Sequence, residues 1–174
     1  MRRAFTLIEL LVVIGIILIL TAVALPRFLD TIVLAKVARA EMELRVLGDS
    51  VEHYRTDFPD YPKSIFADLG EVEIELGIFA SLPMLTSPVP YLTELPMDPF
   101  TRSNYQYFST LVETISERVR PFEEIYGSWA VLSVGPDEDI NLNAFTARLI
   151  HYAPTNGTLS RGDIVRSQRE SRFE

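Results

Sequence analysis

The chain has 174 residues, of which 48% are hydrophobic and 23% are charged. This length and composition suit one folded domain and exclude a disordered chain. The sequence contains no cysteine, which excludes disulfides, thiolate metal sites and cysteine nucleophiles. Sixteen Lys and Arg residues against twenty-four Asp and Glu residues give a net charge of -8. Because nucleic-acid binding relies on clustered positive charge, no nucleic-acid partner is expected.

The first 25 residues predict one membrane-spanning helix. Residues 10–25 contain no charged side chain, and with residues 5–9 the segment reaches the roughly 20 residues that a helix needs to cross a bilayer. Arg2 and Arg3 precede it, so the rule that positive charge stays in the cytoplasm places the bulk of the chain outside. The alternative is a cleaved secretory signal, whose apolar run is shorter, roughly 7 to 15 residues.

Glu9 is the one acidic residue in this apolar segment. A carboxylate near the start of a membrane helix is unfavourable by about 2 to 3 kcal/mol, and such residues usually pair with a charge or serve a function. The alternative is that Glu9 lies in the lipid headgroup region, where the penalty is small. The residue pattern alone leaves both interpretations open.

The sequence Ala4-Phe5-Thr6-Leu7-Ile8-Glu9-Leu10 closely resembles the processing site of type IV pilins and of the pseudopilins of type II secretion. The resemblance implies that residues 1–4 are a leader, which a prepilin peptidase removes by cutting between Ala4 and Phe5. It also implies methylation of the new amino terminus on Phe5. Glu9 would then attract the Phe5 amine of a neighbouring copy and set the register between copies. Ala4 stands where the family usually has glycine.

A second helical pattern follows Pro26. Apolar residues recur there at spacings of three and four, which predicts one buried stripe along an amphipathic helix. The stripe consists of Leu29, Val33, Val37, Ala40, Leu44, Leu47, Val51, Tyr54 and Phe58. Because Pro26 lacks a backbone N–H, it should kink or loosen the helix there rather than necessarily end it. We therefore expect one long bent helix from Phe5 to Thr56, made of a transmembrane part, 5–25, and an amphipathic continuation, 26–57.

Residues 58–174 predict a small globular head. Prolines and glycines punctuate short segments there, a pattern typical of a small sheet with ordered loops. The clearest strand is Ser128–Val134, which is apolar on both faces and should be central. Glu71–Leu76 predicts either a half-buried strand or the start of an acidic helix. The expected fold class is α+β, the pilin-like fold, with the long helix packed on a small antiparallel sheet.

Three segments of the head resemble parts of pilin-like proteins. Leu95-Pro96-Met97-Asp98-Pro99-Phe100, followed by Tyr105-Gln106-Tyr107, is similar to a segment of the major pseudopilins and is expected to be a structural turn leading into a strand. Ser160-Arg161-Gly162-Asp163-Ile164 is similar to the ending of a subgroup of bacterial pilin-like proteins, which implies a turn and a short final strand. Ser133, Gly135 and Asp137 match a Ser-x-Gly-x-Asp loop that binds calcium in the major pseudopilins.

This third resemblance implies a calcium site in the acidic loop after Val134. Calcium takes six to eight oxygen ligands, and Asp137, Glu138 and Asp139 could supply several of them together with loop carbonyls. The alternative is an acidic surface turn without an ion, because Gly-Pro-Asp sequences commonly form turns.

Catalysis is not expected. His53 lies on the polar side of the helical pattern, His151 is far away in sequence, and no Ser-His-acid or metal-ligand spacing is present. The resemblance instead implies a homo-oligomeric filament subunit of a type II secretion-like pseudopilus that drives protein export. Its partners would be other pseudopilins, inner-membrane assembly proteins and the prepilin peptidase. The protein would be held in the bacterial inner membrane, with its amino terminus cytoplasmic and its head in the periplasm.

Two alternatives to this function remain at this point. A type IV pilus subunit, acting in adhesion, motility or DNA uptake, shares the same processing motif. A membrane-anchored binding domain whose span is never processed would instead keep Met1.

Overall fold

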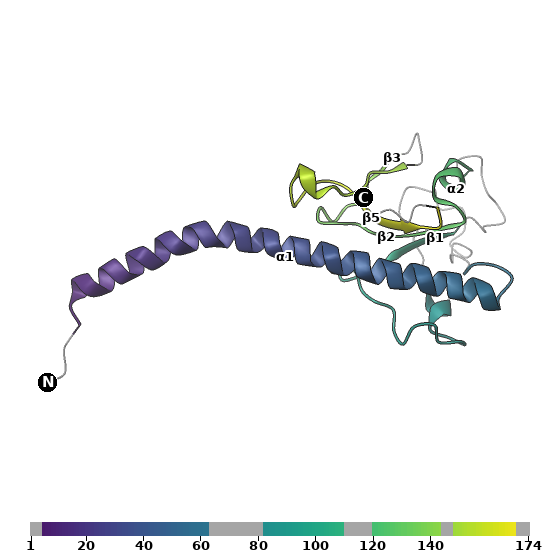
Figure 1. Cartoon of the computed structure of the whole chain (residues 1–174), viewed down its shortest axis with the longest axis horizontal. Coiled ribbons are helices and arrows are strands. Elements are labelled where there is room, and N and C mark those ends of the chain that lie inside the picture. Colours follow the sequence, from purple (N-terminus) through teal and green to yellow (C-terminus); the bar gives the residue numbers. More distant parts are fainter. Residues whose placement is uncertain (1–4, 63–81, 110–119, 144–147, 170–174) are drawn as a thin grey trace, which may run out of the picture.

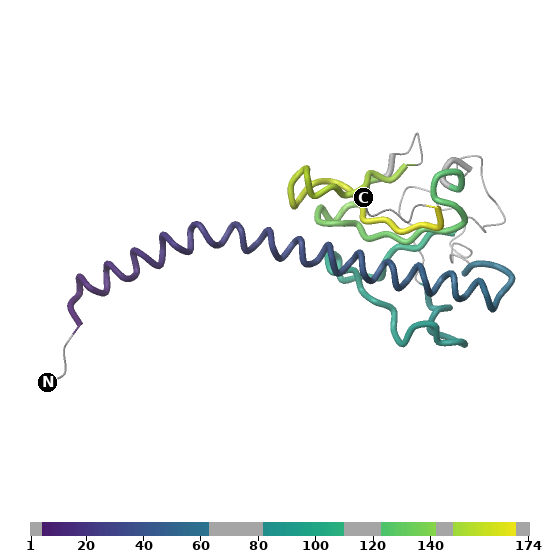
Figure 2. Tube along the Cα trace, in the orientation of Figure 1, coloured from purple at the N-terminus to yellow at the C-terminus, as the bar shows by residue number. Residues whose placement is uncertain are grey.

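A computed structural model describes residues 5–62, 82–109, 120–143 and 148–169. Its dominant element is α1, Leu7–Asp57, a single helix of 51 residues that contains Pro26 without interruption. Figures 1 and 2 show that α1 bends gently along its length and that its first half projects away from the head as a bare rod. The predicted long bent helix is therefore confirmed.

The head is built on a three-stranded antiparallel sheet. Its strands are β1, Gln106–Ser109, β2, Trp129–Ser133, and β5, Ile164–Ser167, in the order β1-β2-β5. Val131 pairs with Tyr107 on one side and with Arg166 on the other. All five residues of β2 are buried and β2 lies between the other two strands, so the predicted central strand is confirmed. The predicted short final strand is β5. This arrangement is the expected α+β pilin-like fold.

Smaller elements complete the described head. They are α2, Arg120–Tyr126, the strand pair β3, Leu142–Asn143, and β4, Arg148–Leu149, and the 3-10 turns η1, Pro83–Leu85, and η2, Pro154–Asn156. The helix α2 was not expected from the sequence. The ambiguous segment Glu71–Leu76 lies outside the described residues.

The main core lies between α1 and one face of the sheet. From α1 it takes the middle of the predicted stripe, namely Val37, Ala40, Leu44, Leu47 and Val51. From the sheet it takes Tyr107, Trp129, Val131 and Ile164. Leu29, at the membrane end of the stripe, is 55% exposed. A smaller core covers the opposite face of the sheet and consists of Tyr126, Ala130, Leu132, Leu149 and Val165.

Acidic side chains of α1 fix the head along the helix. Four of them accept hydrogen bonds from head side chains, which adds direction to the apolar packing. The pairs are Asp30 with Thr158 Oγ1 at 2.8 Å, Glu43 with Tyr105 Oη at 2.6 Å, Glu52 with Trp129 Nε1 at 2.8 Å, and Asp57 with Tyr91 Oη at 2.6 Å.

The Leu-Pro-Met-Asp-Pro-Phe segment forms the structural turn that its sequence indicated. Asp98 is 2% exposed, and its Oδ1 accepts a hydrogen bond from the Phe100 backbone N–H at 2.8 Å. The Asp98 backbone N–H donates to the Ser103 carbonyl at 2.9 Å. These bonds close the turn that leads the chain into β1.

Gly48 permits the close approach of the sheet to α1. A Cβ atom at this position would lie 2.9 Å from the Trp129 ring and 3.1 Å from Arg166 Cγ.

We expect Gly48→Val to destabilise the fold by about 1 to 3 kcal/mol through overpacking. Urea unfolding of the full chain in detergent micelles, followed by the fluorescence of the single tryptophan, measures this. Ala38→Val, at an exposed position of the same helix, is the control and should cost less than about 1 kcal/mol. Equal effects of the two substitutions would contradict the packing argument.

Three tyrosines that contact α1 or the core should make the fold sensitive to alkali. Burial, and then the hydrogen bond to Asp57, raises the pKa of Tyr91 to about 12, and burial raises the pKa of Tyr105 and of Tyr107 still further. In the unfolded chain these phenols ionise near pH 10. The folded state therefore holds more protons above pH 10, so its stability is fully present below pH 10 and falls as the pH rises toward 12.

Urea unfolding at pH 8, 10 and 11 checks this expectation. The stability of a Tyr91→Phe variant should fall less between pH 8 and pH 11 than that of the wild type, because the phenylalanine ring cannot ionise in either state. The interpretation fails if absorbance at 295 nm shows all seven tyrosines titrating near pH 10 while the protein stays folded.

Candidate functional site

The amino end of α1 places Glu9 beside the predicted processing site. Thr6 caps the helix: its backbone N–H and its hydroxyl donate to Glu9 Oε2 at 2.8 and 2.7 Å, and the Glu9 backbone N–H donates to Thr6 Oγ1 at 3.3 Å. This reciprocal arrangement follows from the Thr-x-x-Glu spacing. It holds the Glu9 carboxylate over the start of the helix, next to Phe5. Ala4, on the other side of the predicted cleaved bond, lies outside the described residues.

The first half of α1 has an uncovered apolar surface. Its most apolar 18-residue window is 0% buried, and α1 is the one described helix long and apolar enough to cross a membrane. The hydroxyls of Thr21 and Thr31 donate to the carbonyls of Ile17 and Arg27, each at 2.8 Å. The Thr21 pairing lies in the predicted transmembrane part, 5–25, and satisfies the hydroxyl in lipid, where water cannot. The helix α1 continues through Pro26.

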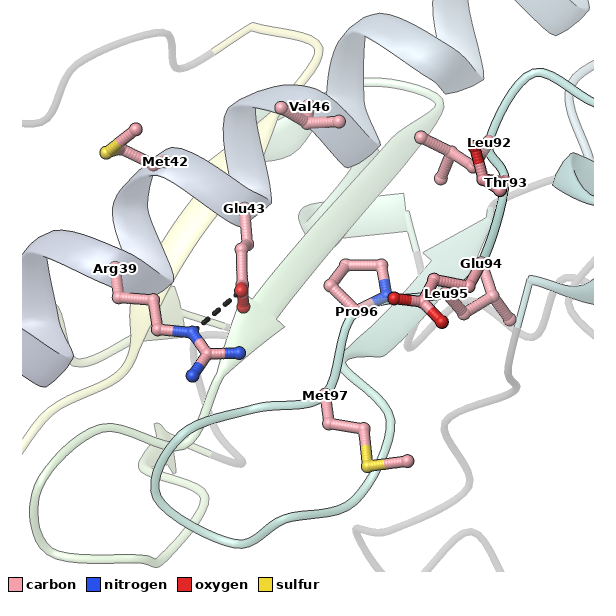
Figure 3. Close-up of a pocket in the computed structure, with 10 residues that line it drawn as sticks. All are labelled: Arg39, Met42, Glu43, Val46, Leu92, Thr93, Glu94, Leu95, Pro96 and Met97. Atoms are coloured by element: carbon pink, nitrogen blue, oxygen red, sulfur yellow. Dashed lines mark hydrogen bonds and ion pairs between the residues drawn. The ribbon is translucent and has the colours of Figure 1, made fainter.

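An open groove of about 660 Å³ runs beside the second half of α1. Figure 3 shows α1 side chains along one side and the segment 92–97 along the other. Met42 and Val46 are 68% and 51% exposed, although both are apolar. At the edge of the groove, Arg39 Nε lies 2.8 Å from Glu43 Oε1. An open apolar groove of this kind suits contact with another protein chain better than enclosure of a small molecule.

The acidic loop does not gather the three predicted calcium ligands. Asp137 is half-buried, whereas the side chains of Glu138 and Asp139 are exposed. The loop is held by its own bonds, with the Glu138 backbone N–H donating to the Gly135 carbonyl at 3.2 Å. In the described parts of the chain, no three His, Cys, Asp or Glu side chains converge on one point that could hold a metal ion.

A further acidic residue, Asp163, lies against this loop. It is fully buried, and its Oδ2 accepts the backbone N–H of Asn141 at 3.0 Å. The Asn141 side-chain amide donates to Asp137 Oδ2 at 2.9 Å, so Asn141 bridges the two aspartates. The second oxygens, Asp137 Oδ1 and Asp163 Oδ1, are buried and have no hydrogen-bond partner among the described residues. The sequence indicated only a turn at Asp163, because its partners are distant along the chain.

The electrostatics at Asp163 reflect this burial. Removal from water raises the pKa of its carboxyl group to about 7. The hydrogen bond from the Asn141 backbone acts in the opposite direction, and the negative charges of Asp137 and Asp139 add to the rise. A buried carboxylate with an unpartnered oxygen is costly unless a proton or a cation compensates it.

Comparisons with known proteins bear on the amino-terminal site. Residues 1–25 match the family described as "Prokaryotic N-terminal methylation motif". No curated protein and no solved structure matched the chain. The motif supports the type IV pilin-like class, whose members are structural subunits processed by prepilin peptidase, and it does not separate pilus from pseudopilus subunits. The motif and the apolar helix that carries it fit a pilin-like subunit anchored by a single membrane span.

Proposed function

We propose that this protein is a structural subunit of a type II secretion-like pseudopilus. The observation that carries the proposal is the capped Glu9 at the start of a continuous helix whose first half is apolar and bare. Lipid covers such a surface while the subunit is in the membrane. Once the subunit leaves the lipid, the same surface must be covered by other apolar surfaces, and copies of the same helix can supply them.

Glu9 would set the register between copies. Cleavage before Phe5 creates a positively charged amino terminus, and the Glu9 carboxylate of a neighbouring copy is a suitable partner for it. The Thr6 hydroxyl and N–H hold that carboxylate at the helix start, 2.7 and 2.8 Å away. In an apolar surrounding an unpaired charge is strongly disfavoured and a paired one is tolerated, so the contact selects one alignment rather than adding net stability.

Three features favour a pseudopilus subunit over a type IV pilus subunit. The buried Asp98 turn corresponds to the segment that resembles the major pseudopilins. The acidic loop after Val134 resembles theirs as well, and calcium binding in that loop is part of this proposal. The chain has no cysteine, whereas many pilus subunits close a loop with a disulfide.

Processing should leave a shortened, methylated chain. We expect mass spectrometry of the protein purified from membranes of its host to show loss of residues 1–4 and one methyl group on the amine of Phe5. Ala4→Gly, which restores the usual family residue, should be processed at least as completely. Ala4→Leu should remain uncut, because a bulky side chain replaces a small one at the cleaved bond. An intact Met1 terminus in the native protein would favour the unprocessed anchored domain.

Substitution of Glu9 separates assembly from insertion. We expect Glu9→Ala to enter the membrane normally but to form filaments at least about tenfold less, because a buried amine left without its partner costs several kcal/mol. Asp49→Ala, an acid-to-alanine change at a side chain of the same helix that is 67% exposed, is the control and should assemble normally.

Two cellular measurements decide which filament is involved. Export of proteins into the medium should fall in the Glu9→Ala strain while its surface pili remain unchanged. Loss of surface pili with intact export would instead favour the type IV pilus subunit, and wild-type filament levels would refute the role of Glu9.

A further inference from the structure

The loop that carries η2 is the part of the head nearest to the membrane half of α1. Figure 1 shows this yellow-green loop at the end of the head that faces the bare rod. Thr158 Oγ1 donates to Asp30 Oδ1 at 2.8 Å, so a head residue is tied to α1 just beyond its predicted transmembrane part, 5–25. The loop therefore has a fixed level along the helix axis.

That level can be compared with the dimensions of a bilayer. Residues 5–25 are long enough to cross a hydrocarbon core of about 30 Å at a rise of about 1.5 Å per residue. Asp30 follows Leu25 closely in the same helix and lies about 7.5 Å past the end of that core. The headgroup layer is roughly 5 to 7 Å deep on each side, so the loop stands at its outer edge. A helix tilt of about 20°, which is average for membrane spans, brings a loop on that side of the helix closer to the lipid.

The loop is held in shape by its own hydrogen bonds and presents an apolar side chain. Ser160 Oγ donates to the Ala153 carbonyl at 2.9 Å, and the Ser160 backbone N–H donates to the Gly157 carbonyl at 3.1 Å. Leu159 is 69% exposed and belongs to neither core cluster of the described residues. Because the loop is already ordered, little conformational entropy is lost when this leucine is buried against another surface.

The helix adds matching side chains at the same level. Phe28 and Leu29 are 62% and 55% exposed, and Arg27 beside them is exposed as well. Arg161, which follows Leu159 in the loop, is also exposed. Apolar side chains flanked by cations are typical of surfaces that lie in the membrane interface, where the cations meet lipid phosphates.

We propose that the η2 loop, through Leu159, rests on the phospholipid surface that α1 crosses, and that this contact holds the head of the unassembled subunit at one angle to the membrane. Leu159 enters the headgroup layer, while Arg27 and Arg161 pair with lipid phosphates. Lipid is favoured over a second copy of the chain because the span places lipid at this level whenever the subunit is in the membrane. The inference goes beyond the proposed function, since it concerns the subunit before a filament forms and requires only the membrane span.

The absence of cysteine allows one fluorescent label to be placed at a chosen position. Leu159→Cys and Val89→Cys are each labelled with the fluorophore NBD in the full chain, which is reconstituted into vesicles of phosphatidylcholine and phosphatidylglycerol. Val89 is the matched control, because it is also an apolar loop residue of the head and is 41% exposed. Its loop is tied to α1 by the hydrogen bond from Tyr91 to Asp57, about 40 Å farther along the helix than Asp30.

We expect lipids that carry a nitroxide on the headgroup to quench the label at position 159 at least about threefold more than the label at position 89. A label at Phe28→Cys gives the value for full headgroup contact, and quenching at position 159 should lie within about twofold of that value. Thr158→Val removes the hydroxyl that is bonded to Asp30 and keeps the size of the side chain. In this variant quenching at position 159 should fall by at least about half, because the loop is no longer held at the level of the headgroups.

Three results would overturn the inference. The first is equally weak quenching at positions 159 and 89, which would mean that the loop stays in water. The second is equally strong quenching at both positions, which would mean that the label itself enters the lipid. The third is NBD emission at position 159 that shifts to the blue as the protein-to-lipid ratio rises but is not quenched by the nitroxide lipid, which would mean that a second copy covers Leu159. Because the vesicles contain no assembly machinery, these results leave the proposed filament role untouched.

Discussion

The position of the head on α1 depends on burial of the apolar stripe of the helix against the sheet. Each buried leucine or valine of the stripe contributes about 1.5 to 3 kcal/mol relative to an exposed one, so these side chains decide which face of the helix the head occupies. The sheet can approach closely because Gly48 leaves room for Trp129. Because this packing ends near Val33, the preceding half of the helix stays bare and is available for lipid or for other copies.

Polar contacts then orient the head on the helix. Apolar packing alone is non-directional, whereas the acids of α1 accept hydrogen bonds at fixed positions from Asp30 near the membrane half to Asp57 at its far end. Glu52 receives both the Trp129 ring N–H and the Tyr61 hydroxyl, which joins the central strand to the end of the helix. The acidic composition of the chain thus has a structural use within the subunit.

The two candidate sites share one physical requirement, which is that a carboxylate removed from water needs a compensating partner. Glu9 has Thr6 within its own chain, and the proposed filament would add an amine from a neighbouring copy. Among the described residues, Asp163 has one side-chain hydrogen bond for its two carboxylate oxygens. In both cases the charge favours one specific geometry over alternatives with similar apolar packing.

The sequence by itself determined the long helix and its division into an apolar first half and an amphipathic second half. The apolar spacing from Val33 to Tyr54 and the Thr-x-x-Glu cap are local patterns, and local patterns set backbone structure directly. It also determined that Ser128–Val134 holds a central strand, observed as β2, since a strand that is apolar on both faces must be covered on both. Only the tertiary structure decided that Asn141 bridges Asp163 and Asp137, and that Glu138 and Asp139 face solvent. Their positions depend on how β5 returns beside β2, a pairing of segments distant in the chain that no local periodicity encodes.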